Sequence, residues 1–257
     1  MFLLFCFTVT TVMFFGSWGI SWLVMKDRTQ IGAFAQASVR SSAAILGVAF
    51  AVNIYGNSGM VPMMVLASVP FFNAYSVIIL SFSPQVPSAD GTPQAAIDRA
   101  ARIRKALFNV VTNPIIIGIL LGVPFALWNI QLPTMLSSAV STVGGTATPV
   151  ALLVIGASFS GSEALTRWKP AACASFIKLF LLPAIVLPIA IAMGFRQSEL
   201  IAILIMAGAP TTVSAYIMAK EMRADSVLTS NCVVLSTLLS SVSITLWLYV
   251  LRLLAAI

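Results

Sequence analysis

Long apolar runs dominate this chain and decide what it can fold into. A transmembrane helix needs about 20 apolar residues, because it must cross roughly 30 Å of hydrocarbon. Runs of this kind lie near residues 1–25, 33–53, 58–82, 107–127, 133–157, 170–194, 198–219 and 226–251. Only 8% of the residues are charged, against roughly 25% in soluble domains. The sequence therefore predicts an all-α integral membrane protein with about eight transmembrane helices, whose first partner is the lipid bilayer.

The basic residues predict how these helices are oriented. If successive loops alternate sides, most Lys and Arg residues fall on one side, and only Arg196 and Arg252 fall on the other. The crowded side holds Lys26, Arg28, Arg99, Arg102, Arg104, Lys105, Arg167, Lys169, Lys220 and Arg223. Basic loops stay in the cytoplasm, so this side is expected to be cytoplasmic and both termini outside. The net charge of +7 thus reflects membrane orientation, and no nucleic-acid partner is expected.

Spacing of the runs indicates an inverted repeat. Displaced by about 168 residues, the first three runs fall on the last three, and corresponding pieces then face opposite sides of the membrane. The expected organisation is an incomplete first repeat of three helices (1–82), a cytoplasmic connector (83–105) and a second repeat of five helices (106–257). The first repeat then lacks two helices, through truncation, a start codon assigned too late, or a natural short form.

Two apolar runs contain segments that we expect to break the helix. The first is Arg40–Gly47 and the second is Ala207–Thr212, where Pro210 lacks an amide hydrogen and clashes with the preceding turn. The two segments occupy equivalent repeat positions, as expected for helices that cross at a central site. Broken helices expose carbonyls and helix N-termini that can bind a ligand. A proline kink with small residues that pack neighbouring helices is the simpler alternative.

Two basic side chains lie inside apolar runs, while every acidic residue lies in a loop or at the end of a run. Arg40 and Lys178 would each cost about 2.5–3.5 kcal/mol to insert, and such residues tend to be functional. Buried positive charge suits a carboxylate, and the guanidinium of Arg40 matches one in a bidentate fork. Snorkelling to the interface or a structural role is the alternative, above all for Lys178. The predicted substrate-binding residues are Arg40, Ser41, Ser42, Gly208, Pro210, Thr211, Thr212 and Lys178.

The order and spacing of four segments resemble the auxin efflux carrier family, in particular its bacterial members, which are related to the PIN-type auxin carriers. These segments are 34–47 (FAQASVRSSAAILG), 113–122 (NPIIIGILLG), 147–157 (ATPVALLVIGA) and 209–219 (APTTVSAYIMA). The resemblance implies two five-helix inverted repeats with a crossing fourth and ninth helix, and a chain that starts at the third helix. Ser42 stands where the family often has Asn, and Ala49 stands where plant relatives often have the crossing proline. The implied location is the bacterial inner membrane.

The resemblance implies a secondary transporter of small organic anions, such as auxin, malonate or malate, that works by alternating access. A non-transporting fragment or partner subunit is an alternative, because two helices are missing from the expected repeat. An intramembrane enzyme is less favoured: the chain has no histidine, which leaves only a Ser–Lys pair at Lys178. No metal site and no cofactor are expected. Gly118 and Gly122 form a small-residue pair that could close a homodimer or simply pack neighbouring helices.

Overall fold

The structure is a computed structural model that describes residues 1–84, 130–157, 166–255 and 257, together with single positions between 104 and 125. Every regular element in these ranges is helical. In chain order they are α1 (Phe2–Val24), the 3₁₀ turn η1 (Arg28–Gln30), α2 (Ile31–Ala37), α3 (Ala43–Tyr55), α4 (Val61–Phe82), α7 (Thr134–Ala157), α9 (Trp168–Phe176), the π-helical turn η2 (Ile177–Leu181), α10 (Leu182–Ala192), α11 (Ser198–Gly208), α12 (Val213–Glu221) and α13 (Ser226–Leu253). The prediction of an all-helical chain is confirmed for the described residues.

Five stretches of the described chain are long and apolar enough to cross a membrane. They are Phe2–Val24, Val61–Phe82, Trp168–Ala192, Ser198–Glu221 and Ser226–Leu253. A sixth expected span, 33–53, is divided between α2 and α3, and 133–157 corresponds to the long helix α7. Most of the span expected at 107–127, and nearly all of the connector at 83–105, lie outside the described residues. The predicted number of about eight transmembrane helices therefore stays a prediction.

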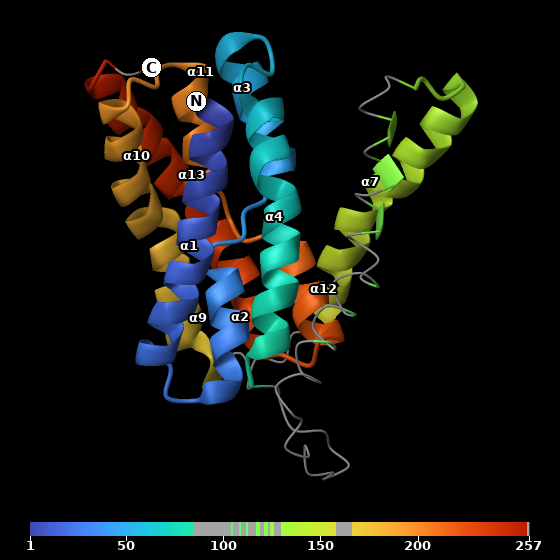
Figure 1. The fold of residues 1–257 in the computed structure, drawn as a ribbon, viewed down its shortest axis with the longest axis vertical. Coiled ribbons are helices and arrows are strands. Elements are labelled where there is room, and N and C mark those ends of the chain that lie inside the picture. The colour runs from blue at the N-terminus through green and yellow to red at the C-terminus, as the bar shows by residue number, and fades with distance from the viewer. Residues whose placement is uncertain are drawn as a thin grey trace.

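Most of the described helices form one bundle with α11 at its centre. Every residue from Leu200 to Gly208 is buried, and α11 packs against α3, α4, α10 and α13. The outer helices α1 and α13 instead leave many apolar side chains exposed, such as Leu23 and Leu238. This pattern is typical of a helix bundle in lipid, where burial follows packing and not polarity. Helix α7 lies to one side of the bundle and contacts α12 (Figure 1).

Both expected helix breaks are present, but their limits differ from the prediction. The first runs from Ser38 to Ser42, because α3 resumes at Ala43 and residues 43–47 are helical. This part of the expected break was wrong: Ala and Leu favour a helix, the segment has no proline, and α3 continues through Gly47. The second break is shorter than expected, from Ala209 to Thr212. Both lie at mid-height in the bundle (Figure 1).

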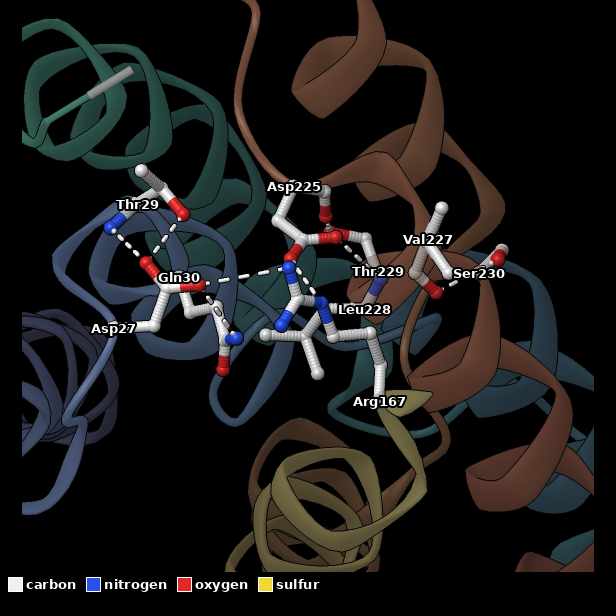
Figure 2. A network of polar contacts seen from close by, with 9 residues as sticks. All are labelled: Asp27, Thr29, Gln30, Arg167, Asp225, Val227, Leu228, Thr229 and Ser230. Carbon is white, nitrogen blue, oxygen red and sulfur yellow. Dashed lines mark hydrogen bonds and ion pairs between the residues drawn. The ribbon is translucent and has the colours of Figure 1, made fainter. Parts of the chain in front are cut away.

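The chain ends and loops divide between the two ends of the bundle. Both termini lie at one end, and the α1–α2 loop and the α12–α13 turn lie at the other (Figure 1). A cluster of ion pairs joins the α1–α2 loop to the α12–α13 turn (Figure 2). Arg167, at the start of α9, pairs with Asp225 at 3.0 Å and with Asp27 at 3.5 Å. This cluster ties segments of the first and last parts of the chain together.

Hydrogen bonds from neighbouring groups hold Asp27 ionised. They lower its pKa below the ordinary value of 3.8, chiefly through the hydroxyl of Thr29, while the charge of Arg167 adds a smaller effect. A carboxyl whose folded-state pKa is lowered stabilises the fold above its unfolded pKa. The contribution of Asp27 is therefore present at neutral pH and is lost as the pH falls through the lowered pKa.

We expect Asp225→Ala to lower the free energy of unfolding by about 1–2 kcal/mol, because Asp225 has two roles. Its Oδ1 accepts a hydrogen bond from the amide of Leu228 at 2.8 Å, which caps α13, and its Oδ2 pairs with Arg167. Asp225→Asn keeps a good capping group but loses the charge, so it should cost less. Thermal unfolding of the purified variants in detergent measures both changes. Equal melting temperatures for wild type and Asp225→Ala would contradict this account of the cluster.

Labelling of single cysteines tests the expected orientation. Asn57 is exposed in the loop between α3 and α4, and Glu221 is exposed at the end of α12. Figure 1 shows the α3–α4 loop at the end of the bundle that carries the termini and the α12–α13 turn at the other end. In a background without Cys6, Cys173 and Cys232, an impermeant thiol reagent added outside intact cells should label Asn57→Cys and leave Glu221→Cys unlabelled. We expect this pattern because basic loops stay in the cytoplasm, and the α12–α13 turn is one of them. The reverse pattern, or labelling of both, would contradict the predicted topology.

Candidate functional site

The two helix breaks meet and bind each other through backbone and hydroxyl groups. The amide of Ser42 donates to the carbonyl of Pro210 at 2.9 Å. The hydroxyl of Ser41 donates to the carbonyl of Ile205 at 2.8 Å, and the hydroxyl of Thr211 donates to the carbonyl of Ala37 at 2.7 Å. Each break therefore donates to carbonyls of the opposite segment, and the carbonyl of Ile205 accepts in addition from the amide of Ala209 at 3.1 Å. These hydrogen bonds satisfy polar groups where the two breaks cross (here called the crossing), inside an apolar bundle.

The N-termini of two half-helices open on one cavity. Helix α3 begins after Ser42 and α12 begins after Thr212, and neither of these residues caps its helix with its side chain. First-turn N–H groups are thus left without a side-chain acceptor, at the positive ends of two helix dipoles. The cavity has a volume of about 150 Å³. It is lined by Arg40, Ser41, Ser42, Ala44, Val69, Phe72, Asn73, Thr212 and Ser214.

Arg40 lies in this cavity and is only 2% exposed. Its Nη2 donates to the amide oxygen of Asn73, from α4, and to the hydroxyl of Ser214 at 2.8 Å. Its Nη1 reaches the thioether sulfur of Met218 at 3.3 Å, a weak acceptor, and its Nε has no hydrogen-bond partner. No carboxylate in the described ranges forms an ion pair with it. A buried guanidinium with spare donors beside two helix N-termini is suited to bind an anion.

Lys178 lies on the other side of the same crossing, where half-helices end. Its side chain is fully buried, so it does not snorkel to the membrane surface. The ammonium donates to the carbonyls of Val39 and Ala207, both at 2.8 Å, and to that of Met206 at 3.2 Å. These contacts occupy all three of its donors. Lys178 therefore stabilises the crossing in this structure, and a direct contact with substrate stays a prediction.

All eight predicted site residues lie at the crossing, in two groups. Arg40, Ser41, Ser42 and Thr212 line the cavity. Gly208, Pro210, Thr211 and Lys178 instead build the crossing around it. Gly208 leaves no room for a side chain, since a Cβ there would stand 2.7 Å from the ring of Pro183. Whether any of these residues touches a substrate stays a prediction.

Two polar residues of the cavity, Asn73 and Ser214, were not among the predicted site residues. Asn73 is a buried amide in the middle of the apolar helix α4, and a polar residue at that depth could have drawn attention to it. Ser214 lies two residues beyond the expected second break. Its signal was weak, since a serine in a membrane helix commonly bonds to its own backbone. No group of three or more His, Cys, Asp or Glu side chains in the described ranges is placed to hold a metal ion.

Comparison with known proteins agrees with a transporter. The family model described as "Membrane transport protein" matches residues 2–248. An uncharacterized transporter from Methanothermobacter thermautotrophicus is 30% identical over 129 residues, which cover 50% of this chain and 42% of that protein. The matched segment thus spans less than half of the relative's length. The expected resemblance to auxin efflux carriers fits the family match. The chain belongs to the membrane transport protein family.

Proposed function

We propose that this protein carries small organic anions across a cell membrane by alternating access, and that the anion binds in the cavity at the helix crossing. The observation that carries the proposal is the buried Arg40, with spare donors and no carboxylate partner in the described ranges. A bare guanidinium at this depth is costly, so an anion is its expected partner. Family membership supports transport as the activity.

The size of the cavity favours the smaller of the expected substrates. Its volume of about 150 Å³ is below the roughly 300–1,000 Å³ of pockets for drug-sized ligands. Malonate- or malate-like anions suit this volume better than an indole acid such as auxin. One carboxylate would bind Arg40 and the first-turn amides of α3 and α12. The hydroxyls of Ser42, Thr212 and Ser214 would bind the remaining oxygens.

The inverted repeat belongs to the same proposal. Under the offset of about 168 residues, Ala37 corresponds to Ile205 and Val39 to Ala207. These are the carbonyls that accept from the opposite break and from Lys178. We therefore assign 1–82 to three helices of a first repeat, 83–105 to a cytoplasmic connector and 106–257 to the second repeat, with both termini outside. A homodimer through Gly118 and Gly122 is a further expectation of this organisation.

A panel of anions and neutral analogues tests the proposal. At a tenfold excess over its dissociation constant, a ligand that binds only the folded state adds about 1.4 kcal/mol of stability. For a chain of this size the melting temperature then rises by about 3–6 °C. We expect this rise with malonate or malate on purified protein, a smaller rise with indole acetate, and none with malonamide, the uncharged analogue of malonate. An equal rise with malonamide would show that charge is not recognised and would contradict the proposal.

A further inference from the structure

Lys178 makes a contact that the anion site does not explain. Its ammonium is enclosed by three backbone carbonyls, those of Val39, Met206 and Ala207, at 2.8–3.2 Å. Lys178 forms no ion pair with an acidic side chain in the described part of the chain. A buried lysine is costly without a partner of opposite charge. Its compensation must come from the backbone.

The three carbonyls belong to the C-terminal ends of two half-helices. Met206 and Ala207 lie in the last turn of α11, and Val39 follows the end of α2. A helix C-terminus carries the equivalent of about half a negative charge, so two such ends converge on the ammonium. Unwound carbonyls and half-helix C-termini are also the groups that coordinate Na⁺ in transporters with broken helices. The ligands around Lys178 are thus of the type that binds a small cation.

A π-helical turn brings Lys178 to this position. The turn Ile177–Leu181 interrupts the long helix between α9 and α10 and contains Lys178. Such a turn inserts one extra residue into a helix, and π-turns are frequent at functional sites. The indole of Trp247, on α13, donates to the carbonyl of Leu179 at 2.9 Å and so satisfies a backbone group in the widened turn.

We propose that these carbonyls form a cation site common to both helix breaks, and that the Lys178 ammonium is a tethered cation that fills it. The crossing then keeps its positive charge without taking up a sodium ion at this site. If the proposed transport function holds, the consequence for transport is that the cycle needs no sodium at the crossing. Anion and cation charges are divided along the crossing, with the substrate at the N-termini of α3 and α12 and the ammonium at the C-termini of α2 and α11.

Melting temperatures in different cations test this site without any organic anion. Wild-type protein should melt at the same temperature, within about 1 °C, in sodium chloride and in N-methyl-D-glucamine chloride of equal ionic strength. Lys178→Ala should melt lower and leave the carbonyls open. Methylammonium or Na⁺ at a tenfold excess over its dissociation constant should then raise its melting temperature by about 3–6 °C, and the rise should saturate. Lys26→Ala, at an exposed lysine, is the matched control and should respond like wild type.

Two results would overturn the proposal. One is a saturable rise of the wild-type melting temperature with sodium. Because this measurement needs only wild-type protein, it tests the proposal even if Lys178→Ala does not fold. The other is a folded Lys178→Ala protein whose melting temperature rises with Na⁺ and methylammonium no more than that of wild type does. Neither result bears on anion binding, which the panel of carboxylates measures separately.

Discussion

Arg40→Gln is expected to weaken binding of the organic anion by ten- to a hundred-fold. A hydrogen bond to a charged group contributes about 1.5–3 kcal/mol, and each 1.4 kcal/mol is about tenfold in affinity. Glutamine keeps much of the side chain's length and polarity, so the loss reports mainly on the charge. Arg40→Lys keeps the charge but not the bidentate fork, so it should fall between Gln and wild type. Titration calorimetry with malonate on the purified proteins gives the affinities.

The matched control for this experiment is Arg252→Gln. Arg252 is an exposed arginine in the last turn of α13, near the C-terminus and remote in sequence from the crossing. This change should leave the affinity for malonate unchanged, and a monodisperse elution profile confirms that each variant is folded. If Arg40→Gln binds malonate as tightly as wild type, Arg40 has only a structural role with Asn73 and Ser214.

Pro210→Ala is expected to lower the rate of anion transport about tenfold while the protein stays folded. Ala209 is extended, as a residue before proline prefers to be, and this ends α11 at Gly208. An alanine at 210 restores an amide that can bond to the carbonyl of Met206, which now accepts from Lys178. Helix α11 could then continue and disturb the amides of α12 that face the cavity. The charge at the helix end and one backbone hydrogen bond together contribute about 1–3 kcal/mol to the stabilisation of an anion there.

Pro188→Ala provides the control for a proline inside a membrane helix. Pro188 lies within α10 and is exposed. The change should leave transport close to the wild-type rate, because α10 continues through Pro188 without a break. Uptake of labelled malonate and thermal unfolding should be measured on the same preparations. Wild-type uptake by a folded Pro210→Ala protein would show that the break at 209–212 does not need its proline.

The parts of the fold that were predictable depend on local sequence. The lengths of the apolar runs alone predicted the spans Phe2–Val24, Val61–Phe82 and Ser226–Leu253 to within a few residues. Pro210 marked the second break, because proline acts on its own helix. The first break has no proline, and its limits were less accurate. It is held by bonds to the opposite break, such as that from Ser41 to the carbonyl of Ile205, which no local pattern reveals.

The candidate site was predictable only in part, for a similar reason. Arg40 and Lys178 stood out because charges inside apolar runs are rare. Their different environments depend on residues far away in the chain: Lys178 bonds to a carbonyl 139 residues distant, and Arg40 to a hydroxyl 174 residues distant. The π-helical turn that carries Lys178 also left no signal in the sequence. The residue types thus indicated that Arg40 and Lys178 carry the charge of the site. Their hydrogen-bond partners could be identified only from the three-dimensional structure.

Uptake of labelled malonate by proteoliposomes tests the central claim most directly. Purified wild-type protein should give uptake that saturates with malonate, exceeds that of protein-free liposomes, and is inhibited by unlabelled malonate but not by malonamide. Arg40→Gln should reduce the uptake at low malonate at least about tenfold, in line with its loss of affinity. Contradiction would come from wild-type protein that binds malonate yet takes up no more than protein-free liposomes, because this chain would then bind the anion without carrying it.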